Sequence, residues 1–344
     1  MSYKKILVRA TNWLGDAVMS LPALRALHER YPDAELAILA KPSVADLYRR
    51  EPFCHRVIPY TSRTLAEKWS AGIALRREQF DCAVLLQNAF EAAAVAFAAG
   101  IPERIGYARD GRGFLLTRAV PVPLPGEIPP HERFYYLEML HRAGILKALP
   151  ECERIRLQGA DEARASGQAR FKELGLGDTV IGVSPGAAYG SAKRWLPEYF
   201  AETARQVARS LGASVVLFGS AGERGLCASV ADHMDFADVD NTVVCNLAGE
   251  TTLAEFIDLT AACRVFLTND SGGMHVASAL GVPTVAVFGS TNDVTTGPTG
   301  PLARVVRERV ECAPCLKREC PIDHRCMTRL TADKVARVAL ELVK

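Results

Sequence analysis

The sequence lacks long hydrophobic runs and a strong excess of charge of one sign. No stretch of about 18 apolar residues occurs, so the sequence predicts no transmembrane helix. The 41 Lys and Arg residues against 39 Asp and Glu give a formal net charge of +2, without the basic surplus that nucleic-acid-binding proteins show. The N-terminus also lacks the apolar core of a signal peptide, and we therefore expect a cytoplasmic protein with no nucleic-acid partner.

The first expected strand-to-helix turn lacks the glycines of a dinucleotide-binding loop. An apolar run at residues 6–8 is followed by N-W-L-G-D-A-V-M-S-L-P, whereas NAD-binding domains carry G-x-G-x-x-G there. Asp16 would repel a phosphate at this helix start. The turn therefore indicates a different partner, with Asp16 acting either as a helix cap or as an acceptor of protons.

Short apolar runs alternate with longer amphipathic segments along the chain. Runs at 6–8, 34–39, 82–86, 180–183, 214–218, 265–268 and 284–288 predict an α/β fold with parallel strands. A proline-rich segment at 120–130 interrupts the pattern, which restarts at residue 180. Because the chain is longer than one core usually supports, we expect two Rossmann-like domains that face a cleft. These are residues 1–170 and 171–330, and a helix at 331–344 packs back on the body.

Three loops of the second half follow expected strands and suit an anionic ligand. S-P-G-A-A-Y-G-S-A-K-R-W supplies Lys193, and G-S-A-G-E-R supplies Glu223, which can accept hydrogen bonds from a ribose or begin a helix. N-D-S-G-G-M-H opens an apolar helix whose first backbone amides can face a diphosphate. Open α/β sheets bind ligands at this edge, so we expect the nucleotide in the second domain and Asp16 across the cleft from it.

Five ordered motifs resemble the ADP-heptose:lipopolysaccharide heptosyltransferases of glycosyltransferase family 9, and within them the type II enzymes. They are N-W-L-G-D-A-V-M-S-L-P-A-L, P-G-A-A-Y-G-S-A-K-R-W, F-G-S-A-G-E-R, N-L-A-G-E-T-T-L and T-N-D-S-G-G-M-H. The resemblance implies an inverting GT-B transferase of lipopolysaccharide core biosynthesis in a Gram-negative bacterium. It would move L-glycero-D-manno-heptose from ADP-heptose to the first heptose of the inner core. The alternatives are a nucleotide-sugar epimerase of the same fold, or a heptosyltransferase with a different core acceptor.

The resemblance also implies roles for individual residues. Asp16 matches the catalytic base, and Lys193 matches the lysine near the donor phosphates and sugar. One carboxylate suffices for an inverting displacement, and Lys193 with helix-start amides can meet the charge of the leaving ADP. We therefore expect that catalysis requires no cofactor. The expected donor-binding residues are Lys193, Glu223, Thr251, Asp270, Ser271, Gly272, Gly273 and His275, of which His275 could equally be a capping or core residue.

The N-terminal domain is expected to hold the acceptor, heptosyl-Kdo2-lipid A. Arg63, Arg109 and Arg112 lie on glycine-flexible or loop segments and offer guanidinium groups suited to carboxylate or phosphate. A solvated charged loop is the other interpretation. Because the acceptor implied by the resemblance is anchored in lipid, we expect weak and salt-sensitive peripheral contact with the inner face of the cytoplasmic membrane.

Cysteines are concentrated in residues 312–326, near the C-terminus. Their C-x-x-C spacing suits a structural zinc ion, while free or redox-labile thiols, disulfides and a cluster are the alternatives. The expected ligands are Cys312, Cys315, Cys320 and Cys326, with His324 as an alternative. A D-x-D tripeptide at 238–240 resembles the metal motif of transferases of another fold, but it lies outside the three loops, and we expect no metal there.

Overall fold

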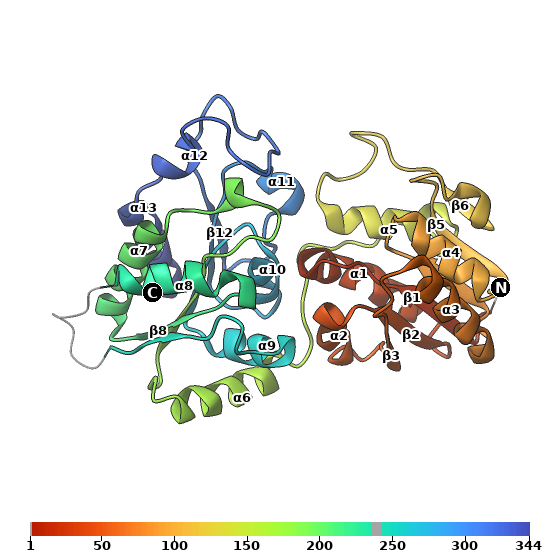
Figure 1. Cartoon of the computed structure of the whole chain (residues 1–344), viewed down its shortest axis with the longest axis horizontal. Helices are drawn as coiled ribbons and strands as arrows, with labels where there is room; N and C mark the ends of the chain where they lie inside the picture. The colour runs from red at the N-terminus through yellow and green to blue at the C-terminus, as the bar shows by residue number, and fades with distance from the viewer. Residues whose placement is uncertain (1, 235–241) are drawn as a thin grey trace. The chain divides into compact units, whose positions relative to one another are not determined.

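The computed structural model describes residues 2–234 and 242–344 (Figure 1), so the D-x-D tripeptide lies outside the described residues. The chain forms two compact units, Met1–Cys152 and Glu153–Lys344. The sequence-based boundary after residue 170 is wrong, because helix α6 (Ala160–Glu173) packs on α9 (Leu253–Ala262) of the second unit. Gly167 permits this close approach, since a Cβ at that position would overlap the carbonyl group of Asp258.

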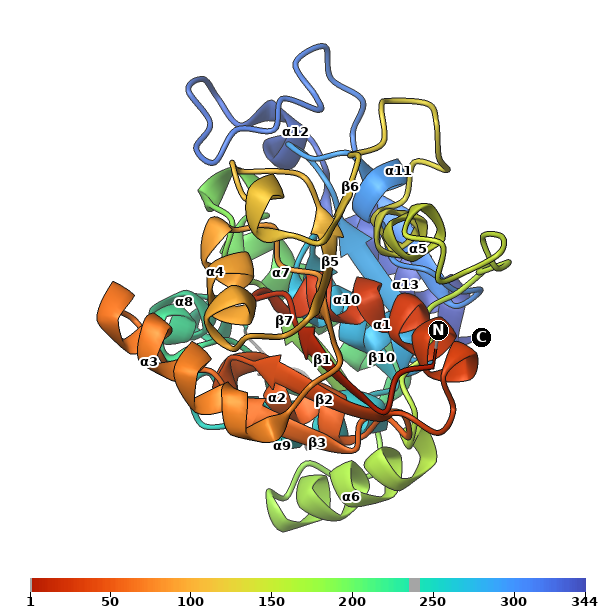
Figure 2. The same cartoon turned by 90° about the vertical axis from the view of Figure 1, so that its right-hand side faces the viewer.

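Unit 1 contains a parallel sheet of six strands in the order β3-β2-β1-β4-β5-β6. Ile6 in the centre pairs with Leu36 on one side and Cys82 on the other. Figure 2 shows α3 and α4 on one side of this sheet and α1 and α5 on the other. The strands are β1 (Lys5–Arg9), β2 (Glu35–Ala40), β3 (Arg56–Pro59), β4 (Cys82–Leu85), β5 (Glu103–Tyr107) and β6 (Arg118–Val120). The helices are α1 (Leu14–Arg30), α2 (Pro42–Arg49), α3 (Leu65–Leu75), α4 (Phe90–Ala98) and α5 (Glu132–Arg142).

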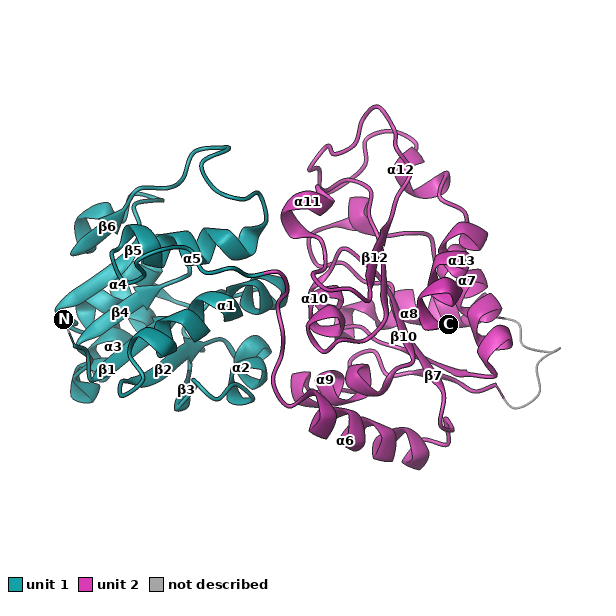
Figure 3. Cartoon of the chain, turned by 180° about the vertical axis from the view of Figure 1, so that it is seen from behind, with its two compact units in different colours: residues 1–152 teal, residues 153–344 magenta. Residues whose placement is uncertain are grey.

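Unit 2 repeats this strand order with its own six parallel strands, β12-β11-β10-β7-β8-β9 (Figure 3). The strands are β7 (Val180–Ser184), β8 (Ser214–Leu217), β9 (Val244–Asn246), β10 (Val265–Asn269), β11 (Thr284–Val287) and β12 (Ala303–Val306). The remaining helices are α7 (Pro197–Leu211), α8 (Arg224–Asp232), α10 (Gly272–Ala279), α11 (Asp293–Thr296), α12 (Arg325–Thr328) and α13 (Ala332–Val343). The α/β class with two Rossmann-like units is thus confirmed.

The C-terminal helix α13 packs on α7 within unit 2. Val335, Ala336 and Ala339 are buried in the same apolar core as Trp195, whose indole N–H donates to the carbonyl of Leu330 at 3.0 Å. In both units the strand order reverses next to the first strand, between β1 and β4 and between β7 and β10. Open sheets bind ligands at the carboxyl ends of the strands at such a reversal, so the loops after these four strands are the candidate ligand-binding regions.

Candidate active site

A buried ion pair joins the loops after β7 and β10. Lys193 Nζ lies 2.6 Å from Asp270 Oδ2, and the two side chains are 14% and 5% exposed. The Thr291 hydroxyl donates to the same carboxylate oxygen at 2.6 Å. Both charged residues were expected from the sequence, but neither their pairing nor Thr291 was. The pattern that could have predicted the pair is that each residue follows a strand and the two strands are neighbours in a parallel sheet.

Asn269 fixes the two loops to one another. Its side-chain amide donates to the Pro185 carbonyl at 2.7 Å, and its side-chain oxygen accepts from the Trp195 backbone amide at 3.0 Å. Asn269 is fully buried. Sequence reasoning missed this role, although the residue lies within the quoted T-N-D-S-G-G motif. Its bonds hold the segment that carries Lys193 against the end of β10.

Glu223 ends the short helix η4 (Ala221–Glu223), directly before α8, and also reaches the loop after β7. Its Oε2 accepts from the Ser220 backbone amide at 2.9 Å and from the Ser220 hydroxyl at 2.8 Å. A Cβ at Gly186 would overlap the Glu223 carboxylate, so the carboxylate lies directly over this glycine. Thr251 lies in the loop after β9, immediately before Thr252, which caps α9. Since β8 pairs with β9, the loops that carry Glu223 and Thr251 are neighbours.

The start of α10 supplies backbone amides at the end of β10. Ser271 has an extended backbone and precedes Gly272 and Gly273, and its hydroxyl lies 3.1 Å from that of Thr268. A Cβ on Gly273 would come within 3.3 Å of Phe256, so the glycine permits tight packing. The amino end of a helix favours an anion. His275 is buried within α10, as the interpretation of a core histidine requires.

In unit 1, Asp16 lies in the first turn of α1 and is half-buried. The N-cap residue is Trp13, so the interpretation of Asp16 as the helix cap is wrong. Glu132, at the start of α5, lies within electrostatic reach of Asp16. Burial is the main cause that raises the pKa of Glu132, the negative charge of Asp16 adds to the rise, and Arg109 opposes it. A second carboxyl group thus accompanies the expected base. Sequence reasoning missed Glu132, because α5 follows the proline-rich segment and only the packing of α5 on α1 brings it there.

The three arginines expected to bind an acceptor differ in their surroundings. Arg112 is fully buried, and its guanidinium donates to the carbonyls of Tyr107 and Gln87 and to the Asn88 side chain. Burial lowers its pKa to about 10. We therefore revise its expected role from acceptor binding to holding the ends of β4 and β5. Arg109 and Arg63 are exposed.

The cysteine-rich segment 312–326 packs against the loop that carries Lys193. The Ala192 backbone amide donates to the Arg318 carbonyl at 2.9 Å, and the Tyr189 hydroxyl donates to the Leu316 carbonyl at 2.8 Å. A ring nitrogen of His324 lies 3.1 Å from the Ala192 carbonyl. The segment therefore supports the lysine loop through one backbone hydrogen bond and two contacts between a side chain and the backbone.

The four cysteines of this segment are free thiols, and Cys326 is the buried one. The pKa of Cys326 is raised to about 11, mainly by burial and in smaller part by the neighbouring cysteines 312, 320 and 315. In the described parts of the chain, no group of three or more His, Cys, Asp or Glu side chains is arranged to hold a metal ion. The zinc site stays a prediction.

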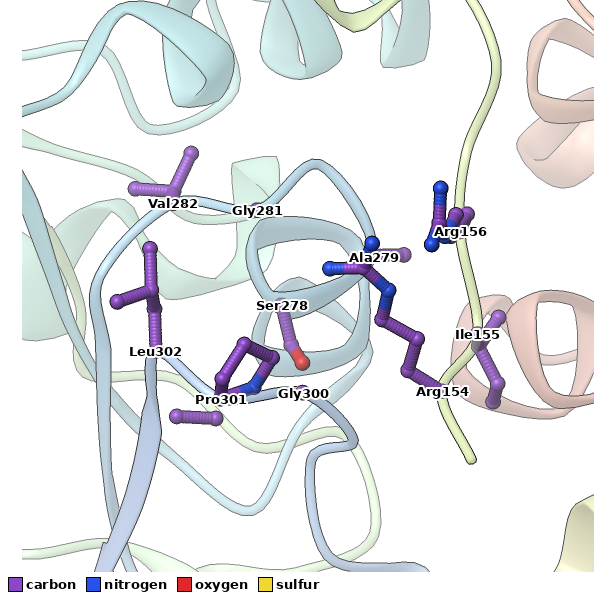
Figure 4. A pocket seen from close by; sticks show the side chains of 11 residues that line it. Arg154, Ile155, Arg156, Ser278, Ala279, Gly281, Val282, Gly300, Pro301 and Leu302 are labelled. Atoms are coloured by element: carbon purple, nitrogen blue, oxygen red, sulfur yellow. The ribbon is translucent and has the colours of Figure 1, made fainter. Parts of the chain in front are cut away.

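A pocket of about 150 Å³ lies elsewhere in unit 2 (Figure 4). Its walls come from the segment at Arg154–Arg156, the C-terminal end of α10 at Ser278 and Ala279, and the turn before β12. None of the three expected donor loops lines it. It is therefore separate from the region around Lys193 and Asp270.

The comparisons with known proteins agree with this geometry. The family model described as glycosyltransferase family 9 (heptosyltransferase) matches residues 69–325. Lipopolysaccharide heptosyltransferase 2 of Escherichia coli K12 is 35% identical over 311 residues, with 88% of each chain covered. Lipooligosaccharide heptosyltransferase 2 of Campylobacter jejuni (serotype O:2) is 27% identical over 348 residues, covering 99% of this chain and 98% of the relative.

Solved structures give the same assignment. ADP-heptose lps heptosyltransferase II of E. coli superposes with a TM-score of 0.83 at 31% identity, covering 98% of both chains. A glycosyl transferase family 9 protein from Veillonella parvula gives the same TM-score at 22% identity, covering 99% of this chain and 97% of its own, and supports the fold alone. The family match covers most of the chain, and a relative above 30% identity covers 88% of it. The chain belongs to glycosyltransferase family 9, the heptosyltransferases.

Proposed function

We propose that this glycosyltransferase moves L-glycero-D-manno-heptose from ADP-heptose to the first heptose of the lipopolysaccharide inner core. The observation that carries the proposal is the Lys193–Asp270 pair at the strand-order reversal of unit 2. The pair places a cation that can bind a phosphate next to a carboxylate that can bind sugar hydroxyls. The match to family 9, and to relatives named heptosyltransferase 2, favours transfer over epimerisation.

On the donor side, the diphosphate would lie between Lys193 and the amides that begin α10. Glycines 272 and 273 have no side chains of their own to cover these amides, and the helix dipole favours the negative charge there. Glu223 and Thr251, on the neighbouring loops after β8 and β9, would flank the adenosine. As ADP leaves, Lys193 would meet the charge that grows on its phosphate.

The transfer itself needs one proton acceptor. The acceptor hydroxyl oxygen attacks the anomeric carbon of heptose from the face opposite the diphosphate, and the bond between that carbon and the phosphate oxygen breaks. The electron pair of that bond leaves with ADP, and Asp16 takes the hydroxyl proton. Burial and the nearby charge of Asp16 raise the pKa of Glu132, so this second carboxyl group takes up a proton more readily than an exposed glutamate.

On the acceptor side, Arg63 and Arg109 would contact the anionic groups of the inner core. Both are exposed, and Arg109 acts electrostatically on Glu132, which in turn lies near Asp16. We also propose peripheral contact with the inner face of the cytoplasmic membrane, where a lipid-anchored acceptor would reside. No helix of the described residues has both the length and the apolar character needed to span a membrane.

Mass spectrometry of defined acceptors tests the proposal. The protein is incubated with ADP-heptose and either heptosyl-Kdo2-lipid A or Kdo2-lipid A, with Lys193→Ala as the inactive control. We expect a mass gain of one heptose on heptosyl-Kdo2-lipid A alone, with an equal amount of ADP. Transfer only to Kdo2-lipid A would assign a different core acceptor. Conversion of the free nucleotide sugar without any acceptor would support the epimerase instead.

A further inference from the structure

Helix α3 exposes an apolar stripe on the surface of unit 1. Leu65, Trp69 and Ile73 recur every four residues, which puts them on one face of the helix, and they are 83%, 50% and 44% exposed. The other face packs on α4, where a Cβ on Gly72 would come within 2.7 Å of Ala98. The stripe is therefore not the core-facing side of α3.

Helix α4 and the turn after β5 add aromatic side chains to the same region. Phe90 and Phe97 on α4 are 46% and 48% exposed, and Phe114 in the short helix η2 (Gly113–Leu115) is 78% exposed. The rings of Phe90 and Phe114 lie 6.1 Å apart. Figure 2 shows α3 beside α4, and an ion pair between Lys68 and Glu91 joins them. We call Leu65, Trp69, Ile73, Phe90, Phe97 and Phe114 the α3–α4 patch.

Positive charges stand at both ends of α3. Residues 63–77 contain four basic residues and one acidic residue, and one of the four, Lys68, is paired with Glu91 of α4. Arg63 precedes the helix, and Arg76 and Arg77 follow it, and all three are exposed. The acidic residue, Glu67, accepts bonds from the backbone amides of Arg63 and Thr64 and so belongs to the helix cap.

This combination fits an anionic lipid surface. Guanidinium groups can meet lipid phosphates, while Trp and Leu side chains enter the boundary between headgroups and acyl chains. A second copy of this chain would bring the same positive charges face to face, which disfavours self-association through the α3–α4 patch. We propose that the α3–α4 patch docks unit 1 onto an anionic phospholipid bilayer. This deepens the proposed function, because Arg63 would then lie at the membrane surface from which a lipid-anchored acceptor projects.

The three tryptophans allow a direct test of docking. Trp13 and Trp69 are 61% and 50% exposed, whereas Trp195 is buried. The probe is a vesicle of phosphatidylethanolamine and phosphatidylglycerol with brominated acyl chains, which quench tryptophans that enter the bilayer. We expect quenching in Trp13→Phe and none in Trp69→Phe. Vesicles of phosphatidylcholine and high salt should both abolish it, because the attraction is partly electrostatic. An unquenched Trp13→Phe protein on the anionic vesicles overturns the proposal.

A second experiment separates docking from catalysis. The variant Leu65→Ser/Trp69→Ser/Ile73→Ser should bind anionic vesicles at least about tenfold more weakly. The matched control is Val294→Ser/Leu302→Ser, which removes two exposed apolar side chains from unit 2 and should bind as the parent does. On a deacylated acceptor in solution the triple variant should keep the parent's turnover, and on vesicle-embedded acceptor its KM should rise.

The outcomes distinguish the two proposals. Equal vesicle binding by parent and triple variant would refute docking through α3, whatever the activity. A parent that binds vesicles but transfers heptose to neither acceptor would refute the proposed function and leave the docking intact. A parent dimer in gel filtration that the triple variant dissociates would instead assign the α3–α4 patch to self-association and overturn the lipid proposal.

Discussion

Replacing Lys193 by methionine tests whether the buried ion pair holds the donor loops. The variant keeps an unbranched side chain only one atom shorter but removes the cation 2.6 Å from Asp270. The carboxylate, 5% exposed, then keeps the Thr291 hydroxyl as a donor and loses its counter-charge. Loss of one partner of a buried pair costs about 3–5 kcal/mol. Because Lys193 retains 14% exposure, we expect the lower end, about 3 kcal/mol.

Thermal unfolding followed by circular dichroism measures this cost. For a unit of this size, about 3 kcal/mol corresponds to a fall in Tm of roughly 6–12 °C. The double variant Lys193→Met/Asp270→Asn removes both charges, so most of the loss should be recovered. Calorimetric titration with ADP should show weakened binding in both variants, since each lacks the cation that we propose binds the phosphate.

The contrast between stability and binding makes the experiment decisive. Recovery of Tm without recovery of ADP binding would establish that Lys193 acts on the nucleotide and that its pairing with Asp270 is a separate structural role. A double variant no more stable than Lys193→Met would refute the argument that an unpaired buried carboxylate causes the loss. Full ADP binding in Lys193→Met would remove the residue from the donor site.

Four further outcomes are expected. Asp16→Asn should lower turnover by about 10² or more while ADP binding persists, and near-normal turnover would exclude it as the base. Arg109→Ala should raise the KM for acceptor but not for ADP-heptose, and an equal rise in both would contradict its assignment. The pKa of Glu132 is raised in the folded state, so its ionisation destabilises the fold as the pH rises above the pKa that this group has in the unfolded chain. Glu132→Gln should therefore raise Tm at neutral pH, and the gain should vanish in acid. Elemental analysis of protein purified without chelator should find about one zinc per chain, lost together with thermal stability in Cys312→Ser/Cys315→Ser, whereas metal-free protein of normal stability would refute the site.

Most interior strands were predictable from the sequence, whereas the interior strand β5 and the edge strands were not. The predicted runs at 6–8, 180–183 and 265–268 correspond to β1, β7 and β10, which are buried on both faces and therefore apolar throughout. The strands β3 and β9 lie at sheet edges and are only partly buried. Their apolar runs are only two or three residues long (57–58 and 243–245), so the sequence carries too weak a signal for them.

Some residues of the candidate site were likewise predictable from the sequence, and others were not. Lys193 and Asp270 follow central strands, and the sequence could therefore assign both to one edge of a sheet. The burial of Arg112 could not be foreseen, because its acceptors at Gln87 and Asn88 come from another loop and replace water around the guanidinium. Glu132 likewise depends on the packing of α5 on α1, a contact between helices that no local pattern records.

The single passage of the chain between the two units, at Cys152 and Glu153, has an evolutionary consequence. Each unit builds its sheet from one continuous stretch of sequence, and each repeats the same strand order. Recombination at this junction would therefore exchange a whole sheet without breaking any strand pairing. Under the proposed function, unit 1 could diversify with new acceptor glycans while unit 2 retained one nucleotide sugar, and hybrid genes joined at this junction would encode enzymes of altered acceptor range.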